Sequence, residues 1–416
     1  MSLRLGYLTG QYPRATDTFI QREVATLRAQ GHHVQTFAVR APAPSDQAPQ
    51  GLAEARRSTI YLLPPRGVAR AHLRELLASP GRYLKAIGLA WRICPPGGSA
   101  ILKQLAYFVE AGLLAAQMRK LALTHLHNHF ADSSCSVAMI AAEISGFSFS
   151  FTIHGPAEFF ELSRWRLDEK VGRARFVVCI SSFCRSQVMI AAAPASWDKL
   201  RIVHCGVDVR LFPARRHEGR GRRLLFVGRL APVKGCLVLI EALAQLSDVT
   251  LDIVGDGPSR TELRERAAAL GLAHRVVFHG YMDEAGVRQR LAEADVFVMA
   301  SFAEGVPVVL MEALAAGVPA VATRVAGIPE LIEDGVSGIL VPPAEPTAIA
   351  EAVRGLLEDC ELRNRIAAAG REKVEREFNL GVECERLANL MTGALSEGGA
   401  ARESQRERRV ALTRSP

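Results

Sequence analysis

Two glutamates, Glu304 and Glu312, flank a short apolar segment in the second half of the chain (AEGVPVVLME). The apolar run Val296–Met299 before them predicts a buried strand, and residues 306–316 predict a helix that ends at a left-handed cap on Gly317. Glu304 therefore lies in the loop before this helix. The free N–H groups of a first helical turn form an anion site, so this loop can bind a negatively charged group.

Glu312 lies on the same predicted helix, more than two turns beyond Glu304. Its carboxylate can accept two hydrogen bonds from a vicinal diol such as ribose. Pro307 stands where the first turn of the helix tolerates a proline. The alternative is an ordinary loop charge and a solvent-facing glutamate. However, the helix is otherwise almost all apolar, which predicts burial, and a buried unpaired carboxylate costs roughly several kcal/mol. We therefore expect these carboxylates to have a protein cation or a ligand as partner.

Two cations, Arg229 and Lys234, follow the predicted strand Arg223–Val227 in the segment GRLAPVKG. Ligands of open parallel sheets bind at the carboxyl ends of strands, where two cations can neutralise a diphosphate. The spacing is not that of a P-loop, and exposed surface cations are the alternative reading. A further segment, VGDGP (254–258), lacks the third glycine of a dinucleotide fingerprint and favours a tight turn without a ligand.

Histidines gather in the first half of the chain. His154 stands just past a predicted strand, and His125, His127 and His129 alternate along another. Alternate strand residues share one face, which could suggest a metal site, but no acidic or cysteine ligand is near in sequence. We therefore predict no metal site.

Composition limits the class of protein. Nearly half of the 416 residues are hydrophobic, as in a globular chain with sizeable cores, and the net charge of +8 suits anionic ligands. The eight cysteines form no C-x-x-C pair, which predicts reduced core residues in the cytoplasm. No stretch of ~18 uncharged apolar residues and no signal peptide is evident, so we expect any membrane contact to be peripheral.

Short apolar runs alternate with amphipathic helices along the whole chain, which predicts an α/β protein with parallel sheets covered on both faces. The runs exceed one open sheet and divide into two doubly wound domains. The expected strands are 3–8, 33–39, 123–127, 148–152, 176–180 and 201–204 in the first half, and 223–227, 250–254, 276–279, 296–299, 320–323 and 338–341 in the second.

The polar, basic residues 212–222 predict the linker, which gives domains at 1–212 and 213–377. Residues 397–416 lack a sustained apolar face and predict a disordered tail. Residues 66–103 carry seven cations against one acid, Glu75, interleaved with leucines, Tyr83 and Trp91. This pattern indicates a surface helix that rests on anionic lipid, or else a solvated helical hairpin. The cations lack an aromatic platform suited to nucleic acid, so no nucleic-acid partner is expected.

Five motifs stand in order along the second half: GRLxPxKG (228–235), VGDGP (254–258), FHGY (278–281), EGxPxxLxEA (304–313) and GIPE (327–330). Those of the first half are YPRATDTFI (12–20), HNHFA (127–131), TIHG (152–155), CISSF (179–183) and HCGVD (204–208). Taken together, the second-half motifs resemble the large retaining glycosyltransferase family GT4, which has the GT-B fold of two Rossmann-like domains facing across a cleft. The first half resembles the colanic-acid and exopolysaccharide branch more loosely.

The resemblance implies transfer of a hexosyl unit from a nucleotide-sugar, UDP-sugar first and GDP-sugar next, with retention and without a metal cofactor. It implies catalytic roles for four residues: Arg229 and Lys234 hold the diphosphate, Glu304 lies against the donor sugar, and His154 reaches the sugar from the N-terminal domain. The donor-binding set adds Tyr281 near the base, Gly305, Val306, Pro307 and Val308 through their backbone, and Glu312 on the ribose. It also implies a last helix, 378–395, that packs back on the N-terminal domain.

The implied acceptor is a glycan or a lipid-linked oligosaccharide of the bacterial cell surface. The chain departs from the family at Ala326, where many members have glycine, and at Thr9-Gly10-Gln11, where a glycine pair is usual, which leaves the acceptor and donor-sugar contacts open. Other readings are a nucleotide-sugar 2-epimerase or another enzyme on the same fold, a dehydrogenase, and a binding subunit without turnover.

Overall fold

The computed structural model describes residues 2–14, 16–42, 53–160, 165–213, 216–219, 221–393 and 395. Two compact units divide the chain. The N-terminal unit comprises Met1–Ile180, Arg185–Val203 and Cys384–Pro416, and the C-terminal unit comprises Ser181–Cys184 and His204–Glu383. The chain changes unit at 203–204, so the predicted boundary at 212–213 falls inside the C-terminal unit. The predicted tail lies outside the described residues.

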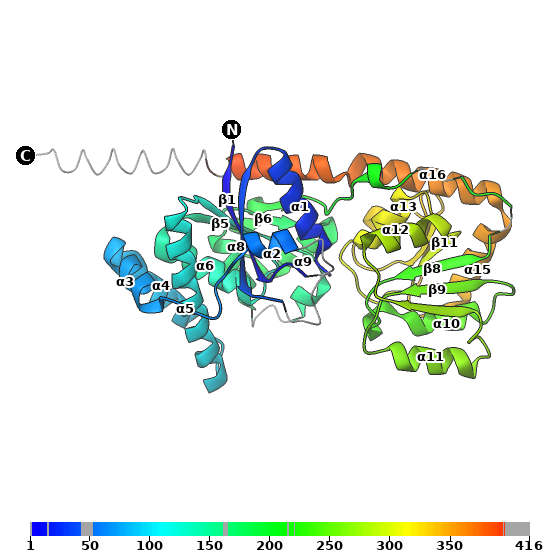
Figure 1. The fold of residues 1–416 in the computed structure, drawn as a ribbon, viewed down its shortest axis with the longest axis horizontal. Helices are drawn as coiled ribbons and strands as arrows, with labels where there is room; N and C mark the ends of the chain where they lie inside the picture. The colour runs from blue at the N-terminus through cyan, green and yellow to red at the C-terminus, as the bar shows by residue number, and fades with distance from the viewer. Residues whose placement is uncertain are drawn as a thin grey trace, which may run out of the picture. The chain divides into compact units, whose positions relative to one another are not determined.

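The C-terminal unit contains a six-stranded parallel sheet in the order β10-β9-β8-β11-β12-β13. Helices cover both faces, with α10 and α11 on one side and α12 and α13 on the other (Figure 1). The strands are β8 (Arg223–Val227), β9 (Thr250–Val254), β10 (Val276–Gly280), β11 (Val296–Met299), β12 (Ala320–Thr323) and β13 (Ile339–Val341). The helices are α10 (Cys236–Leu243), α11 (Arg260–Ala269), α12 (Glu284–Glu293), α13 (Val308–Ala315), α14 (Ile328–Leu331), α15 (Pro346–Glu358) and α16 (Cys360–Glu377).

Burial on both faces explains why these strands could be predicted from the sequence. Every residue of β11 and of β12 is buried, so each appears as an unbroken apolar or small-residue run rather than an alternating one. The structure places four of the six predicted strands of this half at the predicted bounds, and the other two differ by one residue.

The N-terminal unit contains a seven-stranded parallel sheet in the order β3-β2-β1-β4-β5-β6-β7. The strands are β1 (Arg4–Gln11), β2 (His33–Arg40), β3 (Ile60–Tyr61), β4 (His125–His129), β5 (Ser148–Ile153), β6 (Val177–Cys179) and β7 (Leu200–Ile202). The helices are α1 (Thr18–Ala29), α2 (Ala53–Ser58), α3 (Val68–Ala78), α4 (Pro80–Arg92), α5 (Gly98–Lys120), α6 (Ser133–Ser145), α8 (Leu167–Arg173) and α9 (Ser182–Ala191). Residues 380–393 are also helical, and those from Cys384 onward belong to this unit.

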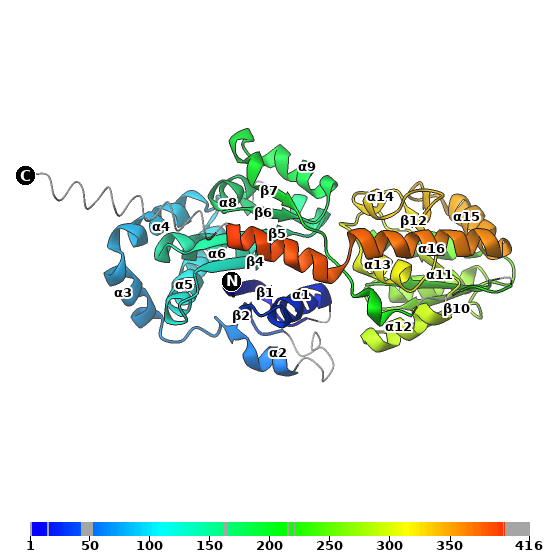
Figure 2. The same cartoon turned by 90° about the horizontal axis from the view of Figure 1, so that it is seen from above.

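Three helices, α3, α4 and α5, form a layer outside α6, beyond the sheet (Figures 1 and 2). Among the described residues, α5 alone is long and apolar enough to cross a membrane by length and composition. It packs against α3 and α6, and 39% of its apolar window is buried inside the protein. The predicted basic segment 66–103 comprises α3, α4 and the start of α5.

Candidate functional site

The loops after β8 and β11 meet at the carboxyl edge of the C-terminal sheet. These two strands are neighbours, but the chain proceeds from them toward opposite sides of the sheet, which makes this the topological switch point. The N–H of Phe302, in the loop after β11, donates to the carbonyl of Val233, in the loop after β8, at 2.8 Å. A ligand site is expected at such a switch point, and the predicted donor-site residues of both loops lie around it.

Gly235 allows this close approach. Its φ is +62°, in the left-handed region, and a Cβ there would overlap the carbonyl oxygen of Ala300. Glycine at this position therefore lets the loop that carries Lys234 lie against the end of β11.

Lys234 and Glu304 form an ion pair across the two loops. Lys234 Nζ lies 2.5 Å from Glu304 Oε1, and Ser301 Oγ donates to the same oxygen at 2.7 Å. Glu304 is buried, and Lys234 retains about a quarter of its exposure, at 24%. The structure thus confirms that Glu304 has a protein cation as partner. Ser301 was not identified from the sequence, although it lies two residues beyond the predicted strand.

The remaining predicted residues of this unit follow strand ends of the same sheet or lie on α13. Arg229 is exposed on the loop after β8, and Tyr281 is exposed directly after β10. The helix α13 begins at Val308, so Pro307 is its N-cap residue rather than a first-turn residue as predicted. Gly317 has φ +70° and follows α13 as the predicted left-handed residue. Glu312 is buried on α13, as predicted.

The backbone at the N-terminus of α13 comes from the other predicted residues. Val308 is the first residue of the helix, and Gly305 and Val306 precede it. Gly327, from the predicted GIPE motif, donates its N–H to the carbonyl of Gly305 at 3.1 Å, and a Cβ on it would overlap that carbonyl. Gly327 therefore allows the loop after β12 to pack against the backbone of Gly305. First-turn N–H groups of α13 that precede its helical hydrogen bonds can receive an anion.

The VGDGP segment acts as a packing turn. Gly228 N–H donates to Val254 O and Leu230 N–H to Asp256 O, both at 2.9 Å. Side chains at Gly255 and Gly257 would overlap backbone atoms of the loop after β8. The turn thus supports the loop that carries Arg229, in agreement with its reading as a turn.

In the N-terminal unit, imidazoles and hydroxyls alternate across β4 and β5. His125 contacts Ser148 and Ser150, and His127 contacts Ser150 and Thr152, all at 2.7–2.8 Å. Burial lowers the pKa of His125 to about 3 and that of His127 well below its ordinary value. These rings are therefore neutral and structural. The hydroxyl partners explain how a strand of sequence HLHNH is buried along its whole length.

His154 directly follows β5 and lies among rings. Its Nε2 is 2.9 Å from His129 Nδ1, and the two rings stack with centroids 5.1 Å apart. Burial, with His129 nearby, lowers the pKa of His154 well below 6.5. The Glu158 carboxyl accepts from the backbone N–H groups of Ala131, His154 and Gly155 and so fixes this turn. Burial nevertheless raises the pKa of Glu158 to about 7.

Side-chain donor atoms of Glu23, His127 and His129 lie within 4.8 Å of one another. Glu23 comes from α1, which is far from β4 in sequence. The structure therefore brings an acid close to the histidines that the sequence alone did not place near them. Both ring nitrogens of His127 are already bonded to Ser150 and Thr152, so a metal ligand set would have to break one of these bonds. The absence of a metal cofactor stays a prediction.

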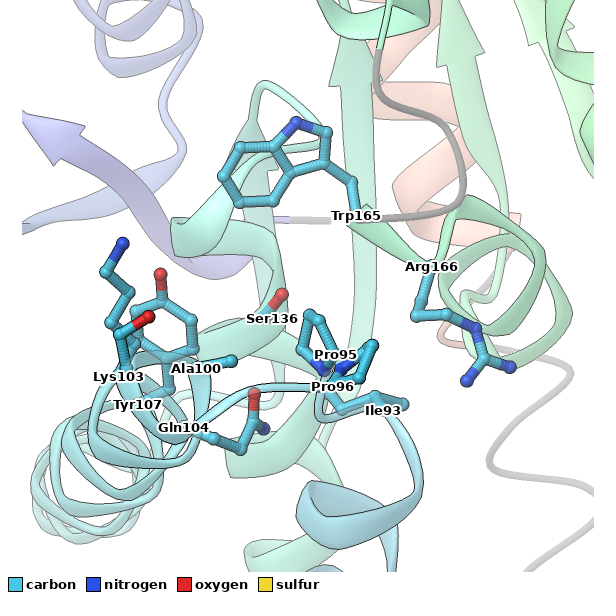
Figure 3. Close-up of a pocket in the computed structure, with 11 residues that line it drawn as sticks. Ile93, Pro95, Pro96, Ala100, Lys103, Gln104, Tyr107, Ser136, Trp165 and Arg166 are labelled. Atoms are coloured by element: carbon cyan, nitrogen blue, oxygen red, sulfur yellow. The ribbon is translucent and has the colours of Figure 1, made fainter.

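A pocket of about 360 Å³ lies elsewhere in the N-terminal unit, between the α4–α5 connection, α6 and the start of α8 (Figure 3). Its walls include Lys103, Tyr107, Trp165 and Arg166. None of the predicted site residues lines it, so the pocket is separate from both groups of residues described above.

Residues 210–373 match the family described as "Glycosyl transferases group 1". The putative colanic acid biosynthesis glycosyltransferase WcaL of Salmonella typhimurium is 27% identical over 94% of this chain and 99% of its own length. The alpha-D-kanosaminyltransferase of Streptomyces kanamyceticus is 29% identical over 65% of this chain and 76% of its own length.

Among solved structures, HepE of Anabaena in complex with UDP superposes with a TM-score of 0.72 and 20% identity, over 94% of this chain and all of that one. This likeness concerns the fold. Together with the two parallel-sheet units, it confirms the predicted GT-B fold class, and the sequence matches confirm the family resemblance.

Proposed function

We propose that this chain, whose residues 210–373 match glycosyltransferase group 1, transfers a hexosyl unit from a nucleotide-sugar to a glycan or lipid-linked oligosaccharide of the bacterial cell surface, with retention of anomeric configuration. A UDP-sugar is the favoured donor and a GDP-sugar the next. The observation that carries the proposal is the Lys234–Glu304 pair at the switch point of the C-terminal sheet, beside the N-terminus of α13. HepE, with which the fold superposes, was solved with UDP, and WcaL is named for colanic acid biosynthesis.

The proposal gives each donor-site residue a role. Arg229 and Lys234 oppose the charge that develops on the departing diphosphate, aided by the N–H groups around Gly305 to Val308. Glu312 accepts from the ribose hydroxyls, and Tyr281 borders the base. Glu304, held by Lys234 and Ser301, contacts the donor sugar, and His154 contributes from the N-terminal unit. The bond between the anomeric carbon and the diphosphate oxygen breaks, and its electron pair stays on the diphosphate. The acceptor hydroxyl oxygen bonds to the same face of that carbon, and the hydroxyl proton passes to the departing diphosphate.

Calorimetry with UDP, GDP, ADP and NAD tests the donor site. One nucleoside diphosphate is expected to bind, and Lys234→Ala and Glu312→Ala are each expected to weaken it at least tenfold. Arg266→Ala is the matched control, because this cation lies on α11 and pairs with Glu241. If only NAD binds, or if the control weakens binding as much, the proposal fails. Turnover of donor without acceptor would indicate a 2-epimerase instead.

Peripheral contact with an anionic membrane through residues 66–103 is part of the proposal. Leu73, Leu77, Leu84, Ile87 and Trp91 are exposed, with Leu77 at 74% and Trp91 at 72%. The other apolar residues predicted for this surface, Leu76, Tyr83 and Leu89, are half-buried or buried. Three apolar side chains on the first turns of α5 add to the exposed set: Ile101, Leu102 and Leu105.

The charge on this surface is more one-sided than the sequence count suggests. Its single acid, Glu75, is buried and accepts two hydrogen bonds from Arg119 at 2.9 and 2.7 Å. Arg92 pairs with Glu169, and the other six cations of the segment are exposed. Exposed apolar side chains beside exposed cations suit an anionic bilayer surface.

Sedimentation with phosphatidylglycerol-containing vesicles tests this part. Reversing Arg70, Arg74, Arg82 and Lys85 to glutamate should abolish binding, since each cation near the surface contributes about 1 kcal/mol. Reversing four cations of the C-terminal unit, Arg260, Arg264, Arg266 and Arg288, is the control. Unchanged binding of the first variant refutes the contact. Concentration-dependent self-association without vesicle binding would assign the surface to a second copy of the chain.

A further inference from the structure

A basic pocket lies at the amino edge of the N-terminal sheet, opposite the edge at which His154 stands. Ser148 begins β5, Arg175 stands two residues before β6, and Lys199 directly precedes β7. These residues line a pocket of about 380 Å³ together with the ends of α6 and α8 and one residue of α4, Arg82. A volume of this size admits a small ligand. None of the predicted site residues is among the described residues of its wall.

The charged side chains of the pocket wall are mostly cations. Among the described residues they comprise one carboxylate, that of Glu143, and four cations: Arg82, Arg173, Arg175 and Lys199. Arg173 pairs with Glu143 at 2.9 Å. Glu169, the second partner of Arg173, also pairs with Arg92, so its charge is shared between the two. The pocket therefore holds more positive charge than its own carboxylate can balance.

The carboxyl ends of two helices balance part of this charge. The left-handed residue Gly146 follows α6, and Arg173 is the last residue of α8; both line the pocket. The carbonyl groups at a helix end act as roughly half a negative charge, so the two ends together balance about one cation and leave about two positive charges. A phosphomonoester carries roughly −1.5 to −2 at neutral pH, which matches this remainder.

Arg82 brings hydrogen-bond donors across the end of α6. Gly146 has φ +79°, and a Cβ on it would lie 2.9 Å from Arg82 Cζ, so the guanidinium lies directly against the glycine. Arg82 is exposed, and within the described part of the chain it forms no hydrogen bond and no ion pair. Its N–H groups can therefore donate to an anion in the pocket.

Lys199 adds a second group of donors. Its Nζ donates to the carbonyl of Gly172 at 2.6 Å, which uses one of three N–H groups. Burial lowers the pKa of Lys199; Asp198 opposes this shift, and the charge of Arg175 adds to it. An anion bound near both cations would reduce the repulsion between Arg175 and Lys199.

We propose that this pocket binds a phosphomonoester, with Arg82 and Lys199 as side-chain donors. Two sources carry this chemistry: a lipid headgroup such as that of phosphatidic acid, and a soluble phosphate ester. Arg82 belongs to the basic segment 66–103, so a lipid would add a specific contact to the proposed membrane surface. The pocket belongs to the N-terminal unit alone, so phosphate binding is independent of the donor site; only the lipid source rests on the membrane contact of the proposed function.

Carbon-13 NMR of protein labelled at lysine Cε tests the pocket directly. The chain has seven lysines, and Lys199→Arg and Lys234→Arg assign the two signals of interest. Glycerol 3-phosphate should shift the Lys199 signal in a saturable way. Sodium acetate at the same ionic strength should leave that signal in place, because a single negative charge leaves part of the positive charge unbalanced.

Arg82→Gln should weaken the binding of glycerol 3-phosphate, followed by the Lys199 signal, about tenfold, as for the loss of a hydrogen bond to a charged group. Arg57→Gln is the matched control, since Arg57 is an exposed arginine of α2 in the same unit and outside the described pocket wall.

Three results would each overturn the proposal: an unmoved Lys199 signal, an equal shift with acetate, or an equal loss of affinity in Arg57→Gln. The Lys234 signal reports the donor site separately. If it responds to UDP while the Lys199 signal ignores glycerol 3-phosphate, the phosphomonoester site is refuted and the proposed function is not.

Sedimentation with vesicles that contain phosphatidic acid distinguishes the two sources. If the ligand is a lipid headgroup, Lys199→Gln should bind these vesicles more weakly than Arg57→Gln does. Equal sedimentation of the two variants, together with a Lys199 signal that responds to glycerol 3-phosphate, would assign the pocket to a soluble phosphate ester.

Discussion

Lys234→Met tests whether the ion pair at the switch point of the C-terminal sheet contributes both stability and chemistry. Methionine keeps the apolar stem and removes the charge 2.5 Å from Glu304 Oε1. Breaking a buried pair typically costs about 3–5 kcal/mol because a charge is left buried without its partner. Lys234 is 24% exposed and Ser301 still donates to Glu304, so solvent and this hydroxyl reduce the cost. We expect a loss of about 2 kcal/mol in the free energy of unfolding.

The distribution of tryptophan provides a selective assay. The three tryptophans, Trp91, Trp165 and Trp197, all lie in the N-terminal unit, whereas circular dichroism follows both units. In a urea titration, Lys234→Met should therefore shift the transition seen by circular dichroism and leave the tryptophan fluorescence transition in place. A shift in both signals by the same amount would mean that the two units unfold together. The loss in the free energy of unfolding of the whole chain would then be compared with the expected loss.

The double variant separates stability from catalysis. Glu304→Gln removes the buried charge, so Lys234→Met combined with Glu304→Gln should recover more than half of the lost stability. Activity should stay low in all three variants, with kcat/KM reduced about 100-fold or more, because a donor aimed at a developing charge is typically worth about 3–4 kcal/mol. Restored activity in the double variant, or undiminished stability of Lys234→Met, would refute the reasoning.

Three further predictions concern other features. Gly235→Ala should weaken nucleoside diphosphate binding at least tenfold in calorimetry, since a Cβ would overlap Ala300 O and displace the loop; unchanged affinity would contradict this. Burial raises the pKa of Glu110 from 4.5 to about 7, and the charge of Arg40 opposes this shift. The folded state therefore keeps the Glu110 proton at pH values where the unfolded chain has lost it. The free energy of unfolding should fall as pH rises from about 4.5 to 7, by at most about 3 kcal/mol. Glu110→Gln should flatten that decline in thermal unfolding between pH 5 and 8. Elemental analysis should find less than one bound transition metal per chain, and a stoichiometric metal lost in His127→Gln would reverse that expectation.

The sequence predicted the C-terminal sheet well because its strands are buried on both faces. Such strands are continuous apolar runs, so β8, β9, β11 and β12 lie at their predicted bounds. In the N-terminal sheet β4 was placed two residues early, at 123–127, because its own sequence is HLHNH and the apolar signal precedes it. The two-residue strand β3 carries no periodic pattern of its own and was missed.

The candidate site was likewise predicted only in part. Arg229, Lys234, Glu304 and Glu312 were predicted because each follows or lies on an element that can be recognised locally, and the meeting of the loops after β8 and β11 follows from parallel-strand topology. The pairing of Lys234 with Glu304 depends on how two loops pack, which the close contact of Gly235 with Ala300 permits. No local pattern signals such a contact.

Glu23 was missed for a different reason. In α1 it occupies a position that reads as one more polar residue on an amphipathic helix, and its partners lie on strands far along the chain. Only the order β2-β1-β4-β5 places α1 and the ends of β4 and β5 at one edge. A search for acids at the carboxyl edge of β1, made after the topology was assigned, would have found it.

Both sheets repeat the order 3-2-1-4-5-6, and in each the candidate residues lie where the first and fourth strands of that order end side by side. The chemistry at the two places differs, however. In the C-terminal unit, cations and helix N–H groups can bind an anionic group such as a diphosphate. In the N-terminal unit, burial lowers the pKa of His154 and keeps its ring neutral, so the ring offers hydrogen bonds but no charge. Substitutions at Lys234 should therefore lower the affinity for a nucleoside diphosphate, whereas substitutions at His154 should leave that affinity unchanged.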